Sequence, residues 1–595
     1  AEPHGKVISN KQNNTQKKKK KKLDSINAMW QQIFYSLIFV ILVVMAWLRL
    51  YPKPYPGIPY NEASANRVSG DIPDLTPVIK EMDEFSNTLF TITTRKLGTP
   101  IAQLLFPGIR KPLVILEDPR EIEDLLVRRN KEFDKAPMTL DIFSPMFPRA
   151  SISQYTTPEL RAQKRLWVDV MGADFLRKAA APNIYKATIE LIELWRLKAS
   201  TIYNDRSFSV HEDFKNAALD AIWVAVVGEE PGVTRFEMKK LQNQIAGNSH
   251  DLDEKPPHGT FLKEEVAYIS ETIARNSNNP VPKWAQKLET YTPRYRKFRS
   301  TVTAEIGQAM KKAVERYQRL EMGGNLEDDD IDTCMMDLVL RRQMLEAKKA
   351  GMKPTDPTQD QNMLDEMFVM LVGGHDSTAN TLTWFVRFME AYPAVQSELR
   401  AHLKAAFPGP DPPSVDEILG HEIPYFDGAC EEGFRLAGTA KANLRQAVVD
   451  TEILGCRIPK GTEIFMNYHI DRAPVTVDES KRTASSQAAV LKRGDGFQGN
   501  PGRDLGTLEP RRWLVKDEET GNETFNAYAL PQLAFGGGYR GCAGRKLATM
   551  EFRIIVVLLI LNFEFLELPE EYKTMRAKEK IFREPQMPYA KLRVL

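Results

Sequence analysis

Helical patterns dominate the chain, and strand-like stretches are few and short. Apolar residues recur every three to four positions over residues 182–199 and 296–319, which predicts two helices with one apolar face each. Residues 363–390 form a longer apolar pattern that predicts a third helix. Strand-like patterns are confined to residues 448–454 and 462–467. The chain is therefore expected to fold as a mainly α protein with minor β.

A long apolar run, residues 33–50, lies near the N-terminus and carries a single basic residue, Arg49, close to its end. As a helix it would span about 27 Å, close to the hydrocarbon thickness of a bilayer. We therefore expect a transmembrane anchor over residues 30–50. A cleaved signal peptide is the alternative, although no small-residue cleavage site follows the run. Residues 51–60 form a proline-rich hinge, and the polar tail 1–22, which ends in lysines, is expected to be disordered.

The remainder of the chain, residues 61–595, is expected to be one large domain. Of the 595 residues, 42% are hydrophobic, which suffices for a real core, and no break in composition demands a second domain. Residues 474–507 are polar and rich in glycine, serine and lysine, which indicates a surface insertion. The tail contains eight lysines against one glutamate. Most of the basic charge therefore lies outside the body, which lacks the signature of a nucleic-acid-binding protein.

The four cysteines, Cys334, Cys430, Cys456 and Cys542, are few and irregularly spaced. Such usage is typical of a reducing compartment and gives no disulfide framework. Neither C-x-x-C nor H-E-x-x-H occurs in the sequence, so zinc chemistry has little support.

Cys542 has the most informative setting of the four. It lies in a glycine-rich loop, FGGGYRGCAG, at residues 535–544, and a helix-like run over residues 545–561 follows. At a helix N-terminus, the free N–H groups and the positive end of the macrodipole favour the thiolate form of a cysteine. The glycines let a flat ligand approach the backbone closely. The loop therefore suits a soft, anionic metal ligand.

Two other interpretations of this loop explain less of it. Gly536, Gly538 and Gly541 also fit the G-x-G-x-x-G fingerprint of dinucleotide sites, which needs a preceding strand and a surrounding βαβ unit. Pro531 interrupts the preceding segment, and the chain after Gly541 is too short for a full sheet of that kind. A free cysteine in a turn would account for neither Arg540 nor the glycines.

Two adjacent glycines interrupt the long apolar helix pattern. Each costs on the order of 1 kcal/mol against alanine in a helix, so Gly373 and Gly374 indicate a close approach to that face or a local opening of the helix. Asp376 and Ser377 place a carboxylate and a hydroxyl beside this gap. His375 is interpreted as a structural residue, and a buried helix with incidental polar residues is the plainer alternative.

An acid and a base, Glu432 and Arg435, lie three positions apart, which places them on one face of a helix. Such a pair is most often a surface ion pair of little energetic value. A further arginine, Arg512, follows in the segment Glu-Pro-Arg-Arg-Trp at residues 509–513.

These motifs resemble those of the cytochrome P-450 monooxygenases and follow one another along the chain in the same order as in that family. The resemblance is closest to microsomal and filamentous-fungal members. The loop matches F-x-x-G-x-R-x-C-x-G at every fixed position. Residues 373–378 are similar to A/G-G-x-D/E-T-T, with Ser377 in place of the usual threonine. Glu432 and Arg435 match the family's E-x-x-R helix, and residues 509–513 resemble its P-x-R-W segment. The order of anchor, proline hinge and large domain is that of microsomal members.

The resemblance implies the cytochrome P-450 fold, a large helical haem domain with small β-sheets, and gives roles to specific residues. Cys542 would be the axial thiolate ligand of a haem b iron, and Asp376 and Ser377 would deliver protons to oxygen. Leu160 stands where the family often has a tryptophan ahead of a propionate-binding cation. The remaining implied residues are Arg540, Arg445, Phe535 and either Lys164 or Arg165 for haem binding, and Glu432, Arg435 and Arg512 as a structural triad.

The implied reaction inserts one oxygen atom from O₂ into a lipophilic small molecule. Electrons would come from NADPH through a separate flavin-containing reductase, with cytochrome b5 as an optional partner. The resemblance implies a single-pass protein of the endoplasmic reticulum membrane with a cytosolic catalytic domain, although the lysines before residue 33 favour the opposite orientation. Fungal members often act in secondary metabolism, and the motifs indicate no particular substrate.

Two other functions stay open at this point. A haem-thiolate isomerase or dehydratase would need no reductase, and a haem-binding sensor or scaffold would catalyse nothing. The Asp376–Ser377 pair argues against both, because neither function requires proton delivery to oxygen. Dependence of turnover on a reductase separates the three.

Overall fold

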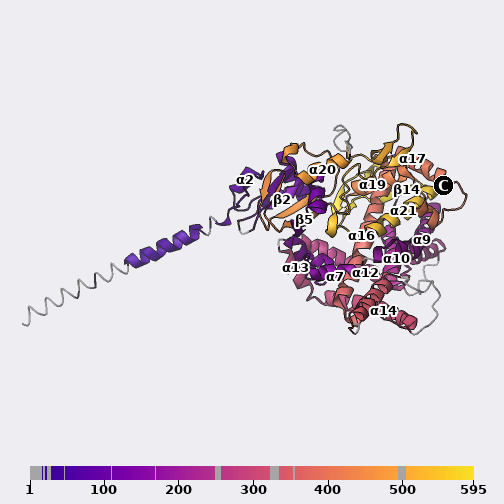
Figure 1. The fold of residues 1–595 in the computed structure, drawn as a ribbon, viewed down its shortest axis with the longest axis horizontal. Coiled ribbons are helices and arrows are strands. Elements are labelled where there is room, and N and C mark those ends of the chain that lie inside the picture. The colour runs from indigo at the N-terminus through magenta and orange to yellow at the C-terminus, as the bar shows by residue number, and fades with distance from the viewer. Residues whose placement is uncertain are drawn as a thin grey trace, which may run out of the picture.

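The computed structural model (Figure 1) describes most of the chain, namely residues 17, 21–22, 29–45, 47, 49–108, 110–167, 169–247, 256–279, 281–321, 334–352, 356–493 and 504–595. The N-terminal tail, apart from residues 17, 21 and 22, lies outside the described residues, so its expected disorder stays a prediction.

Helices make up most of the body, as the hydrophobic pattern predicts (Figure 1). The three helices predicted over residues 182–199, 296–319 and 363–390 are α9 (Ala181–Ser200), α14 (Pro293–Glu321) and α16 (Gln361–Ala391). The other α-helices are α2 (Glu62–Ala65), α3 (Ile72–Met82), α4 (Phe85–Phe90), α5 (Pro119–Glu123), α6 (Pro137–Phe143), α7 (Pro158–Leu166), α8 (Ala173–Phe175), α10 (His211–Val227), α11 (Val233–Ile245), α12 (His258–Ser277), α13 (Pro282–Glu289), α15 (Met335–Lys349), α17 (Pro393–Ala406), α18 (Val415–Gly420), α19 (Pro424–Ala437), α20 (Ala484–Arg493) and α21 (Arg545–Asn562).

The strands form small sheets around this helical body. A five-stranded sheet has the order β1-β2-β8-β5-β3, in which only β2 and β8 pair in parallel. The strand predicted over residues 462–467 is β8, whereas the pattern over residues 448–454 yields only the three residues of β6. The strands are β1 (Ile101–Leu104), β2 (Leu113–Leu116), β3 (Phe133–Lys135), β4 (Phe208–Ser209), β5 (Ala442–Ala447), β6 (Thr451–Ile453), β7 (Cys456–Ile458), β8 (Glu463–Asn467), β9 (Leu514–Lys516), β10 (Glu523–Phe525), β11 (Phe563–Leu566), β12 (Ala577–Glu579), β13 (Arg583–Pro585) and β14 (Tyr589–Val594).

The long helix α16 runs through the middle of the body and contacts α10, α19 and α21 (Figure 1). It begins at Gln361, and the carboxylate of the preceding Asp360 caps the first turn by accepting the N–H of Asn362 at 2.9 Å. Aromatic side chains fix its position: Phe368 lies 5.1 Å from Phe298, and Phe385 lies 5.2 Å from Phe552 of α21, measured between ring centroids. Complete burial of each such ring contributes roughly 1.5–3 kcal/mol.

The polar stretch 474–507 is a surface insertion only in part, which corrects the expectation from composition. Arg482 is buried and donates two hydrogen bonds to Asp118, at 2.9 and 2.7 Å. The Thr483 hydroxyl donates to Asp124 at 2.8 Å. Polar composition does not require exposure when every polar group finds a buried partner. Residues 494–503 of the stretch lie outside the described residues.

Residues 29–45 form a helix that projects from the body with exposed side chains (Figure 1). Among the described residues, no helix combines the length and apolar character that a membrane span requires. The transmembrane helix predicted over residues 30–50 is therefore not found; residues 46 and 48 of this segment lie outside the described residues.

Candidate active site

The loop that precedes α21 is held in a tight conformation by its own backbone. The Cys542 N–H donates to the Phe535 carbonyl at 2.8 Å, and Gly536 and Gly538 adopt φ angles of 64° and 62°. A Cβ on Gly538 would lie 2.0 Å from the Leu126 carbonyl oxygen, so no other residue fits there. The glycines predicted to allow close approach are therefore required by the packing of the loop itself.

Cys542 is exposed at the end of this loop, three residues before α21 begins at Arg545. Partial burial of the sulfur raises the pKa of the Cys542 thiol above its usual value, although the Gly544 N–H and the Arg545 guanidinium lower it. The groups at the helix terminus thus act in the predicted direction, but burial outweighs them in the ligand-free protein. A bound metal ion changes this balance, because a coordinating thiol loses its proton outright.

Three of the predicted haem-binding cations gather beside the loop. Arg540 donates to the Thr156 hydroxyl at 2.8 Å and pairs with Asp134 at 3.3 Å. Lys164 donates to the Tyr539 carbonyl at 2.8 Å. Arg445 is buried at the edge of the same group. Arg165, the alternative to Lys164, is exposed to solvent, so the structure favours Lys164.

A fourth cation, Lys135, completes the group, and sequence reasoning missed it. Burial lowers the pKa of Lys135 well below its usual value, and the positive charges of Arg445, Arg540 and Lys164 lower it further. Lys135 and Arg445 lie directly opposite each other on β3 and β5. Like charges in that register destabilise a sheet, so this arrangement needs an anion. No motif marks Lys135; only the strand pairing reveals it.

The helix α16 does not open at its glycines, which corrects one of the two expectations drawn from them. It is continuous from Gln361 to Ala391. Gly374 allows close packing instead, because a Cβ there would lie 2.9 Å from Ile222 of α10. Gly373 has no neighbouring atom within 4 Å of a Cβ and is exposed in the middle of an otherwise buried stretch.

Asp376 and Ser377 make their contacts in different directions. The Ser377 hydroxyl donates to the Gly373 carbonyl at 2.5 Å, on the exposed side of α16. The Asp376 carboxylate lies 3.2 Å from the His375 Nδ1 and 4.0 Å from the Lys215 Nζ. Burial raises the pKa of Asp376, but His375 and Lys215 bring it down to about 2. Asp376 is therefore ionised at neutral pH, and its contacts are with His375 and Lys215 rather than with the Ser377 hydroxyl.

Glu551 of α21 is a second group that sequence reasoning missed. The Thr378 hydroxyl, one residue after Ser377, donates to the Glu551 Oε2 at 3.3 Å. Burial raises the pKa of Glu551 to about 8, and the bond from Thr378 only partly offsets this effect. A protonated carboxyl therefore links α21, which follows Cys542, to the glycine motif of α16.

The predicted triad is assembled and buried. Arg435 donates to both oxygens of Glu432, at 2.8 and 2.6 Å, and the Arg512 Nε donates to Glu432 at 2.9 Å. The Trp513 indole adds a fourth bond at 2.9 Å. Burial raises the pKa of Glu432, but Arg435, Trp513 and Arg512 together hold it below its usual range. The pair is therefore not a surface ion pair.

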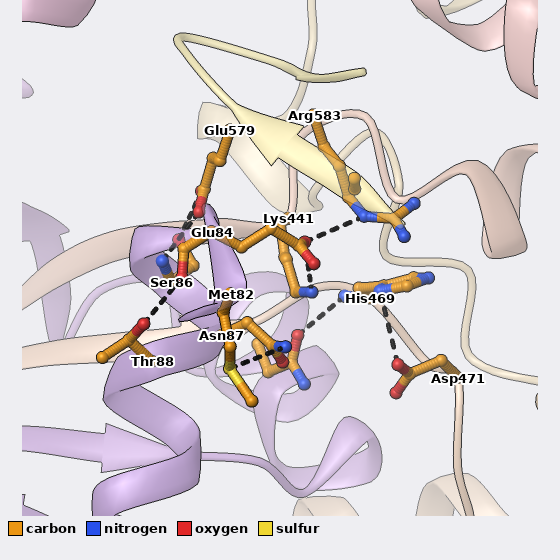
Figure 2. Close-up of polar contacts among 12 residues, drawn as sticks. Met82, Glu84, Ser86, Asn87, Thr88, Lys441, His469, Asp471, Glu579 and Arg583 are labelled. Carbon is orange, nitrogen blue, oxygen red and sulfur yellow. Dashed lines mark hydrogen bonds and ion pairs between the residues drawn. The ribbon is translucent and has the colours of Figure 1, made fainter. Parts of the chain in front are cut away.

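A further buried cluster joins segments that lie far apart in the sequence (Figure 2). The Glu84 carboxylate accepts hydrogen bonds from Lys441 at 2.8 Å and from the Arg583 Nε at 3.0 Å. The Arg583 N–H also donates to the Thr439 carbonyl at 2.9 Å, and the Thr439 hydroxyl lies 2.9 Å from that of Thr381 on α16. The cluster thereby holds the chain that leaves α19 against α16, one turn beyond Ser377.

Comparison with known proteins places these features in one family. The model of the family described as Cytochrome P450 matches residues 99–472 and 507–592. The chain belongs to the cytochrome P450 family. It is 29% identical over 587 residues to the cytochrome P450 monooxygenase TRI13 of Fusarium sporotrichioides, which covers 93% of this chain and 98% of the relative. It is also 29% identical over 595 residues to the cytochrome P450 monooxygenase xilC of Penicillium crustosum, covering 96% and 98%.

The fold agrees with this assignment. The crystal structure of a cytochrome P450 titled CYP102L1 superposes with a TM-score of 0.62 at 17% identity, covering 91% of this chain and 100% of that one. The chain thus has the mainly helical cytochrome P450 fold, and with its fungal relatives it is a monooxygenase. The family implies a haem iron held by a cysteine thiolate.

The residues present fit a haem. A haem held by a thiolate needs an accessible cysteine, cations for its two carboxylates and open space for the flat ring. Cys542 is exposed on its loop, four cations share one neighbourhood, and Gly373 exposes a bare stretch of α16.

Proposed function

We propose that this cytochrome P450 inserts one oxygen atom from O₂ into a lipophilic organic molecule, with electrons from NADPH supplied by a separate reductase. The overall reaction is RH + O₂ + NADPH + H⁺ → ROH + H₂O + NADP⁺. The observation that carries the proposal is the exposed Cys542 thiol in a loop beside which four cations gather. Haem supplies the oxygen chemistry, and the chain supplies ligation, orientation and protons.

Each group of residues has a distinct part in this proposal. Cys542 would hold the haem iron through its thiolate, and electron donation from that thiolate would favour cleavage of the O–O bond. Phe535 packs against Phe434 of α19, with 5.1 Å between the ring centroids, and so holds the start of the loop in place. Asp376 and Ser377 handle protons. The cations that bind the propionates are Lys135, Lys164, Arg445 and Arg540.

We extend the proposal to the protein's location and pathway. Exposed apolar side chains on residues 29–45, and Trp284 and Leu288 on α13, support attachment to the endoplasmic reticulum membrane with the catalytic domain in the cytosol. Lys283 and Lys287 flank the α13 side chains, as is common at a lipid surface. The fungal origin of the relatives supports a role in secondary metabolism. Deletion of residues 1–50 should release much of the protein from carbonate-washed membranes and leave haem binding intact.

The central experiment is a reduced-CO difference spectrum of the wild type and of Cys542→Ala. The wild type should show the strongly red-shifted band of a thiolate haem, and the variant should lack it. Cys456→Ala is the matched control, because Cys456 lies on β7, outside the loop. A band that persists in Cys542→Ala would refute the assignment. Substrate turnover that persists without reductase and NADPH would instead indicate an isomerase or dehydratase.

A further inference from the structure

A charged cavity of about 120 Å³ lies beside Asp376, between α10, α12, α16 and the turn that joins β12 to β13. It has room for several water molecules and polar walls that would hold them. Ala267, Glu271 and Lys580 among its lining residues are exposed, so the cavity reaches the surface of the protein. It therefore connects solvent to a carboxylate in the middle of the molecule.

His375 lines this cavity and is almost completely buried. Its Nδ1 lies 3.2 Å from the Asp376 carboxylate, within ion-pair distance, and both ring nitrogens are buried without a hydrogen bond to the described residues. A buried ring nitrogen without a protein partner, in the wall of a polar cavity, is placed to bond to water. Histidine is also the side chain that most readily gains and loses a proton near neutral pH.

The charges around the pair come from every element packed against it. Lys215 of α10 lies 4.0 Å from Asp376, and Lys263 of α12 pairs with Glu212 at 3.0 Å. From the β12–β13 turn, Lys580 pairs with Glu584 at 3.0 Å. Glu271 of α12 stands at the surface. Most of these lysines are neutralised by their own carboxylates, which leaves His375 as the group in closest contact with Asp376.

Asp376 alone is poorly suited to supply a proton. With a pKa of about 2, it carries a proton in on the order of one molecule in 10⁵ at pH 7. Each proton that oxygen activation takes through Asp376 must therefore be supplied by a neighbouring acid or by water. His375 is in contact with it, and the cavity can reload His375 from solvent.

We propose that His375 is a positioning residue that holds a proton for Asp376 and is reloaded through the water-filled cavity. The N–H bond at Nδ1 of the imidazolium breaks, the proton forms an O–H bond with the Asp376 carboxylate, and a neutral imidazole remains. Asp376 then turns toward Ser377 with the proton, and the ring takes a replacement from water in the cavity. The inference rests on the oxygen-activating role proposed for Asp376 and Ser377.

The first test is His375→Gln, since glutamine can still donate to Asp376 but cannot carry an extra proton. Product and peroxide formed per NADPH are measured from pH 6 to 9, with the exposed His421→Gln as matched control. The variant should keep a normal CO spectrum, lose at least tenfold in product rate at pH 7 and lose the wild-type dependence on pH. A variant with wild-type rate and pH profile would overturn the proposal.

A second variant tests the cavity without touching the pair. Ala267→Phe places a large apolar side chain at its exposed mouth and should raise peroxide release at the expense of product, with haem content unchanged. An unchanged product-to-peroxide ratio would show that protons arrive by another route.

A third measurement needs no turnover, so it separates this inference from the proposed function. In protein labelled with ¹³C at histidine Cε1, the resonance absent from His375→Gln should titrate between pH 5 and 9 and shift in Asp376→Asn. A resonance that does not respond to pH in this range would contradict the proposal even in a fully active enzyme.

Discussion

Two buried groups of charges in this protein are built in opposite ways. Around Glu432, every strong donor has an acceptor: Arg435 and Arg512 bind the carboxylate, and the remaining Arg435 donors reach backbone carbonyls such as that of Leu505 at 2.7 Å. Around Lys135, positive charges face one another, and Lys135 lies directly opposite Arg445 in the sheet. The first group is complete within the chain, whereas the second is complete only with an anion.

This difference indicates what each group is for. A group of buried charges that all have partners within the chain has no charge left to bind a ligand. Its role is to stabilise the fold, and here it holds the segment 505–513 against α19. A group of like charges without a counterion lowers the free energy of unfolding of the ligand-free protein. When an anionic ligand binds, the same charges contribute to its binding energy. The comparison predicts that substitutions in the two groups have opposite signatures in the ligand-free protein.

The largest effect is expected for Glu432→Ala. Loss of this carboxylate leaves two buried arginines without their counterion, which typically costs about 3–5 kcal/mol. Urea unfolding and the yield of soluble, haem-loaded protein should both show a severe loss. Glu398→Ala, which breaks the exposed pair with Arg511, should cost less than about 1 kcal/mol. Equal stability of the two variants would mean that the triad is not a closed unit.

Glu551 is intermediate between the two groups, because it is a buried acid with one hydrogen-bond partner, Thr378, and no counterion among the described residues. Its pKa, about 8 in the folded protein, exceeds the ordinary value of 4.5. Between these values the folded state binds more protons than the unfolded state, so the free energy of unfolding should fall as pH rises from 5 to 8. The slope from this group is at most about 1.4 kcal/mol per pH unit.

The measurement is urea unfolding at pH 5, 6, 7 and 8. Glu551→Gln should lose this part of the slope, because glutamine does not titrate. Glu567→Gln, at a fully exposed acid, should keep it. A wild-type slope in Glu551→Gln would show that the buried carboxyl is not protonated in the folded state.

What the sequence could predict depended on whether a property was local. The helix periods of α9, α14 and α16 and the spacing of Glu432 and Arg435 are local, and the structure bears both out. Arg512 was predicted because it lies in a short motif, Glu-Pro-Arg-Arg-Trp. Lys135 lies in no motif, and its role depends on Arg445 in the paired strand, which is more than three hundred residues away in the sequence.

The errors have the same origin. The glycine pair was expected to mark either a close approach to α16 or an opening of the helix; the opening is wrong, and the close approach is that of Ile222 on another helix to Gly374. The Cys542 thiol was expected to be acidified by the helix end, but the surrounding chain partly buries it and raises its pKa. Residues 474–507 looked like a surface insertion because their partners, Asp118 and Asp124, lie in a distant segment. In each case a tertiary contact outweighed a local tendency.

A smaller effect, with the opposite sign to Glu432→Ala, is expected for Lys135→Met. Removing one of four mutually repelling cations should leave the ligand-free protein at least as stable as the wild type. Haem affinity should fall about tenfold, or roughly 1.4 kcal/mol, because the propionates lose one partner. Haem transfer to apomyoglobin and urea unfolding of the haem-free protein measure the two quantities. The comparison fails if Lys135→Met destabilises the haem-free protein.

The smallest effect is expected at Ser377. Its hydroxyl already has a hydrogen-bond acceptor within α16, and the proposed function also uses this hydroxyl for proton delivery. Its hydroxyl donates to Gly373, and Thr381 and Thr383 make the same bond to the carbonyl four residues earlier, at 2.8 and 2.7 Å. A threonine would therefore fit at 377, and its β-branch would restrict the hydroxyl to fewer rotamers. Ser377→Thr should raise product per NADPH by less than about twofold, whereas Ser377→Ala should divert electrons to peroxide with a normal CO spectrum. If the alanine variant keeps the wild-type ratio of product to peroxide, the serine is only a helix residue and the open side of α16 takes no part in proton delivery.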